Sequence, residues 1–376
     1  MIDSEVIVGT GLRISLSRDE LASRLAVVAR GVSTRTAVLV LGGIQLRAEG
    51  GRLNLAATDM ELSLRASVEA SVEGEGTAVV PGRLLLDIAR SLPDGDVTIE
   101  HRPDEAVVVV TAGSANYRLH TYSAEDFPRL PDVEAAPLHS VDRDVLVETV
   151  ARVGRSASRD ESRPVLTGIL VRFEPGKVVM AATDSYRLSY RETPVEGAVP
   201  ELEAIVPARA LEELRRLVSG GGTLELGVQE NQVVFGAGGT WLTTRRIEGQ
   251  FPKFDELRPK EFKYEVFLPR EELLEVVRRT SVMAHRNSPL RLRFADGEVT
   301  VWTQTQDVGE ARETLPARFE GEPLEIGFNA EFLRDGIESA MGDELRLRLI
   351  DPLRPGLIQG PGDDFWYLIM PIRLAG

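Results

Sequence analysis

Two Thr-Asp pairs are the strongest candidates for acid or base chemistry in this sequence of 376 residues. Asp59 and Asp184 each follow a mainly apolar segment and precede a short polar one. A carboxylate in such a place acts as a general base when its surroundings raise its pKa. More often, an aspartate after a strand accepts hydrogen bonds from the backbone N–H groups that follow it. We expect Asp59 and Asp184 to stabilise turns, because a catalytic group is rarely needed in two places along one chain.

Other residue types that usually carry chemistry are sparse or badly spaced. The chain has no cysteine, which excludes disulfides and thiolate zinc sites. No two of its four histidines stand at a metal-ligand spacing; they are His101, His120, His139 and His285. The run Gly220-Gly221-Gly222 follows an expected helix, whereas a phosphate-binding loop opens one. The sequence predicts a protein that is not an enzyme and that needs neither a metal nor a cofactor.

The two Thr-Asp pairs belong to a longer internal repeat. Thr58-Asp59-Met60-Glu61-Leu62-Ser63 matches Thr183-Asp184-Ser185-Tyr186-Arg187-Leu188-Ser189, and residues 303–313 form a weaker third copy. Further matching segments are Val79-Val80-Pro81 with Ile205-Val206-Pro207, and residues 124–130 with residues 248–254. The period of roughly 125 residues is that of a whole domain, since solenoid units span only about 20 to 50 residues. We predict three domains, at residues 1–133, 134–258 and 259–376.

Each third of the chain is expected to hold a helix, a group of strands, a second helix and more strands. Ser17 stands three residues before Glu20, a capping-box spacing, and Leu21, Leu25 and Val28 follow at helical intervals. Alternating apolar and polar residues flank turn residues in each third, as around Gly50-Gly51, which indicates hairpins. Helices and strands that are segregated in this way predict α+β domains with largely antiparallel sheets.

Composition indicates an ordinary globular protein. With 43% hydrophobic and 27% charged residues, each third has enough apolar residues for a core. No N-terminal targeting segment and no apolar run of membrane-spanning length is present, so we expect a cytoplasmic protein without a membrane partner. The net charge of −15 by itself disfavours binding to nucleic acid.

The repeated motifs, taken in order, resemble one known family. The most specific segments are Leu166-Thr167-Gly168-Ile169, Ala182-Thr183-Asp184-Ser185-Tyr186-Arg187-Leu188, Phe251-Pro252-Lys253-Phe254, Gly327-Phe328-Asn329 and Tyr367-Leu368-Ile369-Met370-Pro371-Ile372-Arg373-Leu374. From about Leu12 to Leu374 the chain is similar to bacterial DNA sliding clamps, the beta subunits of the replicative DNA polymerase III holoenzyme. The resemblance implies three tandem DNA-clamp domains with helices around a central hole and antiparallel sheets outside.

The resemblance also implies what the protein does and with what. It would be a ring-shaped head-to-tail homodimer that encircles double-stranded DNA, slides without sequence preference and acts as a processivity factor. Its partners would be the replicative polymerase, the clamp loader and other proteins with a clamp-binding motif. A specialised non-replicative paralogue that serves as a binding scaffold would share this fold, and the sequence does not decide between the two.

Three sets of site residues follow from the resemblance. Arginines expected to face DNA phosphates are Arg24, Arg30, Arg35, Arg152, Arg155 and Arg159. Residues expected to wall a groove for partner peptides are Arg163, Leu166, Thr183, Ser185, Tyr186, Arg187, Leu188, Pro252, Leu257, Asn329, Phe332, Leu368, Met370, Pro371, Ile372 and Arg373. Tyr117 and Leu119 of one protomer are expected to meet Val282 and Met283 of the other at the dimer seam.

Two features of the sequence bear on these expectations. The expected helical segments are together close to neutral, so nearly all of the net charge of −15 lies elsewhere, which favours a hole that admits DNA. Arg152, Arg155 and Arg159 are expected on one helical face, while the last helix carries Glu331, Asp335 and Glu338 and is acidic. The alternating apolar residues beside Pro371 indicate a strand that ends there, and a free edge from Met370 to Arg373 would serve a peptide backbone.

Overall fold

The computed structural model describes residues 11–33, 37–131, 133, 138–195, 202–217, 222–229, 231–284, 288–295, 297–305, 309–362 and 364–374. The chain divides into two compact units, the first made of residues 1–141 and 216–246 and the second of residues 142–215 and 247–376. The second repeat is shared between them. Its last strands pair with the first repeat, and its earlier strands pair with the third.

The first unit holds two sheets whose paired strands are antiparallel. Neighbours in the five-stranded sheet follow the order β5 (Ser71–Gly74), β1 (Arg13–Ser17), β7 (Asp96–Arg102), β8 (Val107–Ala112) and β9 (Ala115–His120). The eight-stranded sheet follows the order β10 (Leu138–Asp142), β15 (Thr223–Gln229), β16 (Gln232–Ala237), β17 (Thr240–Arg245), β4 (Leu62–Glu69), β3 (Arg52–Thr58), β2 (Gly43–Glu49) and β6 (Gly76–Pro81). Strand β9 therefore has an open edge.

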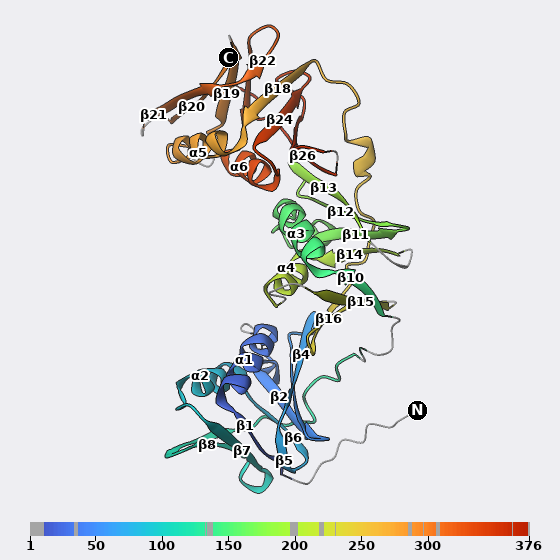
Figure 1. The fold of residues 1–376 in the computed structure, drawn as a ribbon, viewed down its shortest axis with the longest axis vertical. Helices are drawn as coiled ribbons and strands as arrows, with labels where there is room; N and C mark the ends of the chain where they lie inside the picture. Colours follow the sequence, from blue (N-terminus) through green and yellow to red (C-terminus); the bar gives the residue numbers. More distant parts are fainter. Residues whose placement is uncertain are drawn as a thin grey trace. The chain divides into compact units, whose positions relative to one another are not determined.

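Two helices pack side by side in the first unit, α1 (Arg18–Val28) and α2 (Gly82–Ser91), against the face of β2 to β4 (Figure 1). The predicted apolar face of α1 is confirmed, because Leu21, Leu25 and Val28 are buried in the unit's core. The predicted capping box is wrong, since the Ser17 side chain makes no capping hydrogen bond. Ser17 is the last residue of β1 and pairs with Asp96, so strand pairing fixes the start of the helix.

The second unit also holds two antiparallel sheets. Neighbours in the nine-stranded sheet follow the order β14 (Leu202–Pro207), β11 (Gly168–Glu174), β12 (Lys177–Thr183), β13 (Arg187–Pro194), β26 (Phe365–Ile369), β25 (Gly356–Gln359), β24 (Glu344–Leu349), β18 (Tyr264–Pro269) and β22 (Arg318–Phe319). The four-stranded sheet follows the order β21 (Gly309–Pro316), β20 (Glu298–Thr305), β19 (Leu290–Ala295) and β23 (Leu324–Phe328). Strand β21 lies at its edge.

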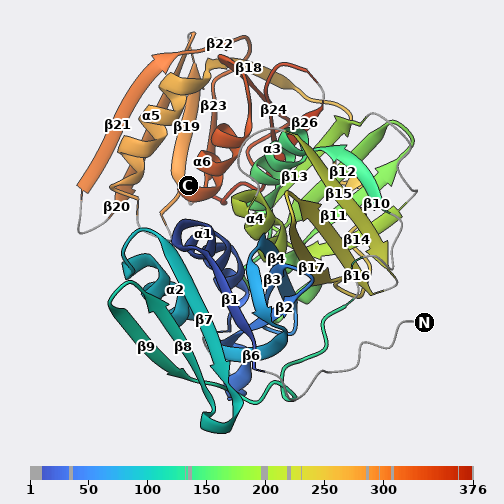
Figure 2. The ribbon, with the colours of Figure 1, turned by 60° about the horizontal axis from the view of Figure 1, so that its bottom comes forward.

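Helices cover these sheets on one face, as in the first unit. Figure 2 shows α5 (Arg270–Ser281) along the four-stranded sheet, where it contacts β20 and β21, and beside α6 (Ala330–Ser339). Helix α3 (Arg143–Val153) packs on β12 and β13, and α4 (Ala208–Leu217) follows β14. Short 3-10 helices are η1 (Ala29–Gly31), η2 (Leu39–Gly42), η3 (Pro103–Glu105), η4 (Gly154–Ser156), η5 (Pro164–Thr167) and η6 (Phe254–Glu256). The predicted α+β class with antiparallel sheets is confirmed.

The repeat is visible in the strand register at two places. Strand β4 pairs with β17 so that Arg65 stands opposite Trp241. Strand β13 pairs with β26 so that Tyr190 stands opposite Trp366. Each pairing joins strands from adjacent repeats, which explains why the sheets run on beyond a single repeat.

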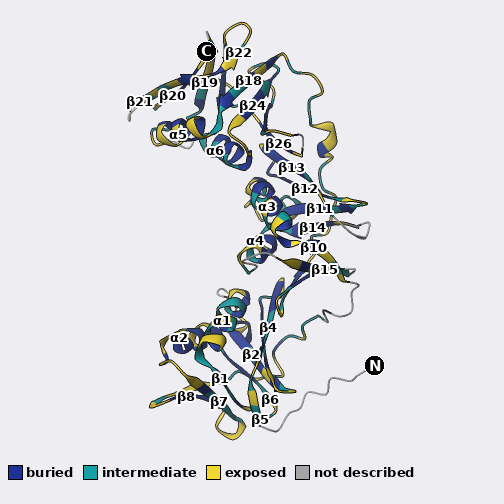
Figure 3. Cartoon of the chain, viewed as in Figure 1, coloured by how far each residue is buried: buried dark blue, intermediate teal, exposed yellow. Residues whose placement is uncertain are grey.

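Burial follows the layers within each unit. In Figure 3 the strands are mostly buried, and the helices expose the sides that face away from their sheets. The core of the second unit includes four large and fully buried aromatic residues, Phe294, Phe328, Phe365 and Tyr367. Within the described part of the chain, no helix has the length and apolar character needed to cross a bilayer.

Candidate functional site

The two Thr-Asp pairs form identical turns, and they are structural. The Asp184 Oδ1 atom accepts the N–H groups of Tyr186 at 2.9 Å and Arg187 at 3.0 Å. Asp59 accepts the equivalent N–H groups of Glu61 at 3.1 Å and Leu62 at 2.8 Å. The prediction that these aspartates stabilise turns is confirmed. No group of His, Cys, Asp or Glu among the described residues is arranged to hold a metal ion.

The middle residue of each turn has a left-handed backbone. Ser185 has a φ of 80° and Met60 a φ of 79°, a conformation that side chains other than glycine rarely adopt. Two further residues hold the turn around Ser185. Arg163 donates to Ser185 Oγ at 3.2 Å, and the Arg163 Nε donates to the Asp160 carboxylate at 3.0 Å. The strained residue persists because several hydrogen bonds determine the turn around it. As a result Tyr186 stands out from the surface, with 60% of it exposed.

Arg187 lies beneath this turn instead of at its surface. Its guanidinium is buried, pairs with Asp184 at 3.0 Å and with Asp335 of α6, and lies 4.3 Å from the centre of the Phe332 ring. Burial alone would lower the pKa of Arg187, but Tyr367, Asp335 and Asp184 together raise it. Arg187 is therefore a permanent cation that ties the turn to α6.

Helix α6 presents Phe332 to the same surface. The Asn329 side chain caps the helix by accepting the Phe332 N–H at 3.0 Å, and the Tyr367 hydroxyl donates to the Phe332 carbonyl at 2.8 Å. The Phe332 ring stacks on Tyr186 with centroids 6.5 Å apart. Asn329 thus acts as a positioning residue for an aromatic pair.

The last segment of the chain completes the surface. Strand β26 is buried through Ile369, and Met370 beyond it is 44% exposed. The Met370 N–H donates to the Tyr186 carbonyl at 2.8 Å, and the Ile372 N–H donates to the Gly327 carbonyl at 2.8 Å. The prediction of a free strand edge from Met370 to Arg373 is therefore wrong, since two of these N–H groups are already bonded and Pro371 has none.

Leu188 and Leu368 lie side by side under this surface. They are register partners in β13 and β26, and both are buried in a cluster with Phe254 and Trp366. They support the groove from below and offer little exposed area. Of the expected groove residues, Tyr186, Leu257 and Met370 are the large apolar ones with substantial exposure. The other members also belong to the second unit, with Thr183 buried, Arg163, Leu166, Pro252, Pro371 and Ile372 half-buried, and Arg373 exposed.

The arginines expected to face DNA are distributed differently from the prediction. Helix α3 ends at Val153, so Arg155 lies in η4 and Arg159 in the loop beyond, and the expected single helical face is wrong. Arg152 is buried: its Nε donates to the Ser339 carbonyl at 2.8 Å, and its guanidinium lies over the Phe365 ring at 4.3 Å. Burial lowers the pKa of Arg152, with Arg191 adding to the effect. A direct contact of Arg152 with phosphate is contradicted by this position.

The remaining arginines are accessible to different degrees. Arg24 is half-buried on α1 and donates to the Gly238 carbonyl at 3.3 Å, and Arg30 is exposed on η1. Arg155 is exposed and pairs with Asp335 and Glu338, while Arg159 is exposed. Arg35 lies outside the described residues.

The four residues expected at the dimer seam differ in how exposed they are. Tyr117 is exposed on the open-edged strand β9, whereas Leu119 of the same strand is buried in the first unit's own core. Val282, just after α5, is 82% exposed, and Met283 is half-buried. Tyr117 and Val282 are therefore free to meet a partner, and Leu119 supports β9 from behind.

Asp160 and Asp335 belong to the site, although the sequence did not single them out for it. Asp160 holds Arg163, and Asp335 holds Arg187. Asp160 precedes Arg163 by three residues, a spacing that is visible in the sequence. Asp335 carries no local signal, because its partner is 148 residues away.

Comparison with known proteins gives one consistent result. Models of the DNA polymerase III beta subunit match in order, the N-terminal domain at residues 12–131, the central domain at 140–253 and the C-terminal domain at 255–373. The beta sliding clamp of Streptomyces coelicolor is 36% identical over 379 residues, which cover 97% of this chain and 100% of that protein. The DNA polymerase sliding clamp of Bacillus subtilis is similar in structure, with a TM-score of 0.92, 25% identity and coverage of 97% and 100%. That of Caulobacter crescentus gives a TM-score of 0.90, 31% identity and coverage of 96% and 100%.

Proposed function

This chain belongs to the DNA polymerase III beta subunit family of bacterial sliding clamps, and we propose that the surface around Tyr186 and Met370 is where it holds its partner proteins. It is a DNA polymerase processivity factor built from three tandem clamp domains. Such a protein needs no catalytic group, because a topological link to DNA keeps the polymerase at a high effective concentration. The proposed domain boundaries remain at residues 133/134 and 258/259.

One observation carries the proposed partner site. Tyr186 and Met370 are among the large apolar residues that stay exposed, and the hydrogen bond from the Met370 N–H to the Tyr186 carbonyl holds them side by side. Leu257 adds a third exposed apolar side chain from the segment after η6. A methionine adapts its shape to different apolar partners, which suits a site used by several proteins.

The partner segment is a short peptide with a glutamine, then a leucine and a final leucine or phenylalanine, as in proteins that carry a clamp-binding motif. Its apolar end contacts Met370 and Leu257 above the buried floor of Leu188 and Leu368. Arg163 and Arg373 at the rim accommodate its polar groups. A contact of this modest area corresponds to an affinity in the micromolar range, about −8 kcal/mol.

The ring is proposed as a head-to-tail homodimer. Strand β9 of the first unit and strand β21 of the second are both sheet edges, and a head-to-tail contact pairs one with the other. Such a contact removes the open edges, which sheets otherwise leave free for unwanted pairing. Tyr117 and Val282, with Met283 nearby, mark the two sides of this seam.

DNA passes through the ring, and the contacts are to phosphates. Arg24, Arg30, Arg155 and Arg159 remain candidates, as does Arg35, which lies outside the described residues, and Arg152 is removed from the set because it is buried. Phosphate contacts carry no sequence information, which is compatible with sliding. The replicative polymerase and the clamp loader are the expected partners, and a role on the chromosome places the protein in the bacterial cytoplasm.

A peptide titration tests the partner site. The hexapeptide Gln-Leu-Ser-Leu-Phe-Leu, titrated into the full-length chain by calorimetry, is expected to bind one site per chain in the micromolar range. Its variant with the glutamine and the last two residues changed to alanine is the control. Binding of both peptides with equal affinity, or of neither, would overturn the proposed site.

A further inference from the structure

The first unit contains a hollow surface whose lining residues belong to none of the three sites expected from the sequence. A pocket of about 1150 Å³ lies between the helix-free face of the eight-stranded sheet and a segment made of residues 124–131 and 133, here called the strap. The sheet side of the pocket is lined by Gln45, Arg47, Glu49, Arg52, Asn54, Ala56, Arg65, Ser67, Glu75, Thr77 and Trp241, among others. Its volume exceeds that of most ligand sites, which measure about 300–1000 Å³.

The repeat shows why this pocket is open. The corresponding positions lie roughly 125 residues further on, so the second unit has Leu170, Val179 and Tyr190 where the first has Gln45, Asn54 and Arg65. The strand pairings agree, since Gln45 stands opposite Ala56 and Leu170 opposite Ala181.

In the second unit these apolar residues close the gap. Phe254, from the segment of that unit that matches the strap (residues 248–254), is buried against Tyr190 with ring centroids 5.4 Å apart, and Tyr190 stacks on Trp366 at 4.9 Å. The matching strap residue of the first unit is the smaller Leu130, which is half-buried. Polar side chains and a smaller strap residue therefore leave a space where the second unit has a packed core.

The strap is held in place over the pocket by hydrogen bonds and apolar contacts with the sheet. Arg65 donates through Nη2 to the Pro131 carbonyl at 2.5 Å. Phe127 of the strap is buried with Val40 and Val79. Tyr122, two residues before the start of the strap, donates its N–H to the Val79 carbonyl at 2.8 Å. These contacts hold the strap over the sheet at two points, Phe127 and Pro131.

The charges of the lining favour a single carboxylate. Four guanidinium groups and three carboxylates line the pocket. Arg47 pairs with Glu49 at 2.7 Å, and Arg52 donates to Ser67 at 2.8 Å. Arg129 is exposed on the strap and makes no ion pair or hydrogen bond with any residue that the structure describes. Guanidinium groups bind carboxylates through paired hydrogen bonds, while the three glutamates repel a polyanion such as nucleic acid.

The shape of the pocket favours an extended chain. Its lining comes from five adjacent strands, in the order β17, β4, β3, β2 and β6 (Figure 2). At about 4.8 Å between strands, the floor is roughly 19 Å wide, which matches about six residues of extended peptide at ~3.3 Å each. Trp241 lies at one side with its ring against Gly236, so that it offers a flat apolar contact.

We infer that the pocket beneath the strap binds an extended acidic peptide of a partner protein, with one carboxylate near Arg129 and Arg65 and a large apolar side chain on Trp241. This site is separate from the surface around Tyr186 and Met370, and it does not depend on the function proposed there. The junction between the first and second repeats then binds a ligand, whereas the junction between the second and third repeats is a packed core.

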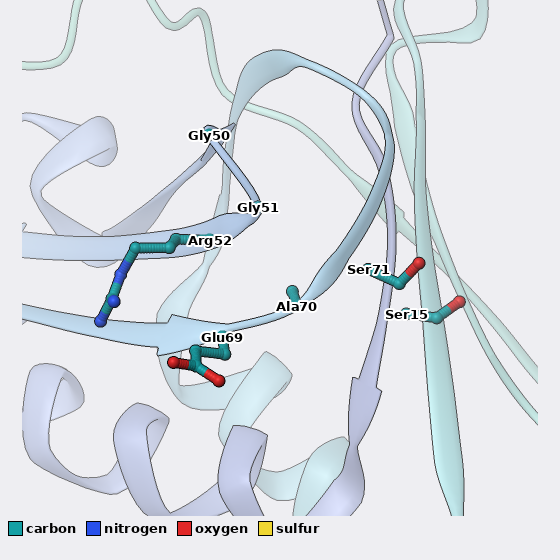
Figure 4. A pocket seen from close by; sticks show the side chains of 7 residues that line it. All are labelled: Ser15, Gly50, Gly51, Arg52, Glu69, Ala70 and Ser71. Atoms are coloured by element: carbon teal, nitrogen blue, oxygen red, sulfur yellow. The ribbon is translucent and has the colours of Figure 1, made fainter.

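A smaller hollow nearby carries no such inference. It measures about 510 Å³ and lies at the tip of the β2–β3 hairpin. Figure 4 shows that Arg52 and Glu69 lie toward one side and Ser15 and Ser71 toward the other, so the polar groups do not converge on a ligand. Its remaining lining residues are Gly50, Gly51 and Ala70.

The tryptophans provide a direct test. The chain has three, Trp241, Trp302 and Trp366, so tryptophan-selective ¹⁵N labelling of the full-length protein gives three indole signals. The probe is acetyl-Ser-Phe-Asp-Leu-Ser-amide, and its control has asparagine in place of the aspartate. We expect the acidic peptide to shift the Trp241 signal saturably, with an affinity at least fivefold higher than that of the control. Trp366, in the second unit, reports any binding at the other surface.

Variants of the lining residues test which side chains bind the peptide. Arg129→Gln is expected to weaken the acidic peptide about fivefold, because this arginine has no described partner to lose. The triple change Gln45→Leu, Asn54→Val and Arg65→Tyr copies the residues that pack in the second unit and should abolish the shift, with Trp302 and Trp366 signals unchanged. If the triple variant does not fold, Asn54→Val alone is expected to weaken binding.

Three outcomes would overturn the inference. Equal shifts from the acidic and neutral peptides would show that no carboxylate is recognised. A tighter response to the single-stranded oligonucleotide dT6 would assign the pocket to nucleic acid. A Trp241 signal that moves with none of these probes would show that the pocket does not bind peptides.

Discussion

The Arg187 guanidinium and the Asp335 carboxylate form a buried ion pair between residues 148 positions apart in the chain. Arg187 belongs to the turn that exposes Tyr186, and Asp335 belongs to α6, which carries Phe332. The same arginine pairs with Asp184 within the turn. One buried cation therefore fixes two segments that together present the aromatic part of the partner surface.

Arg187→Met is expected to destabilise the second unit by about 3–5 kcal/mol, because two buried carboxylates, Asp184 and Asp335, lose the buried cation between them. Chemical denaturation followed by circular dichroism and tryptophan fluorescence measures the loss. Arg155→Met is the control: that arginine also pairs with Asp335 but is exposed, so its removal should cost less than about 1 kcal/mol. Equal losses in the two variants would contradict the assigned role of Arg187.

Met370→Ala should weaken binding of the glutamine-containing peptide about tenfold, corresponding to roughly 1.4 kcal/mol of lost apolar contact. Met341→Ala is a matched control, since Met341 is also in the second unit and is exposed to a similar extent, 51% against 44%. Calorimetric titration of the peptide into each variant measures the two affinities. The partner surface would be misplaced if both variants bound like the unchanged protein.

Val282→Glu should convert the proposed dimer into a folded monomer. The side chain is 82% exposed in the single chain, so a charge there costs little until a partner covers it. Val38→Glu, a change at another exposed valine, should leave the dimer intact. Analytical ultracentrifugation at micromolar concentration gives the mass, and a dimeric Val282→Glu protein would mean that the seam lies elsewhere.

Arg30→Glu combined with Arg159→Glu is expected to weaken binding to circular duplex DNA. It should also lower the slope of log affinity against log salt by about one for each lost phosphate contact. Arg152→Gln should leave this slope unchanged and lower stability instead, because Arg152 is buried against Ser339 and Phe365. A lower slope for Arg152→Gln, with an unchanged slope for the double variant, would show that Arg152 contacts DNA and that Arg30 and Arg159 do not.

The acid stability of the second unit should depend on Glu338. Burial alone would raise the pKa of this carboxyl, but Arg278 and Arg155 beside it lower the pKa below its usual value of 4.5. A lowered pKa in the folded state gives stability that is present above about pH 4.5 and is lost as the pH falls through the folded value. Glu338→Gln should therefore lower stability at pH 7 by about 1 kcal/mol and have less effect near pH 3.

Denaturation midpoints at several pH values test this expectation. Glu331→Gln provides the control, because Glu331 is exposed on the same helix. A Glu338→Gln variant whose stability changes equally at pH 7 and pH 3 would show that the two arginines do not act through the charge of Glu338.

The sequence by itself determined the repeat, the fold class and the family. These depend on patterns that are local or periodic: the Thr-Asp turns, the apolar face of α1 and the ordered motifs from Leu166 to Leu374. The turn role of Asp59 and Asp184 was also predictable, because an aspartate bonds to N–H groups only two or three residues away.

Only the tertiary structure decided which side chains are accessible. Arg152 looks like a surface arginine in sequence, yet Ser339 and Phe365 enclose it, and the end of α3 at Val153 breaks the expected arginine face. The Met370 and Ile372 N–H groups look available in sequence, yet Tyr186 and Gly327 accept them. The open pocket beside Trp241 depends in the same way on how a strap and a distant strand meet. The surroundings of these polar groups depend on contacts with distant segments, which leave no trace in the local pattern of residues.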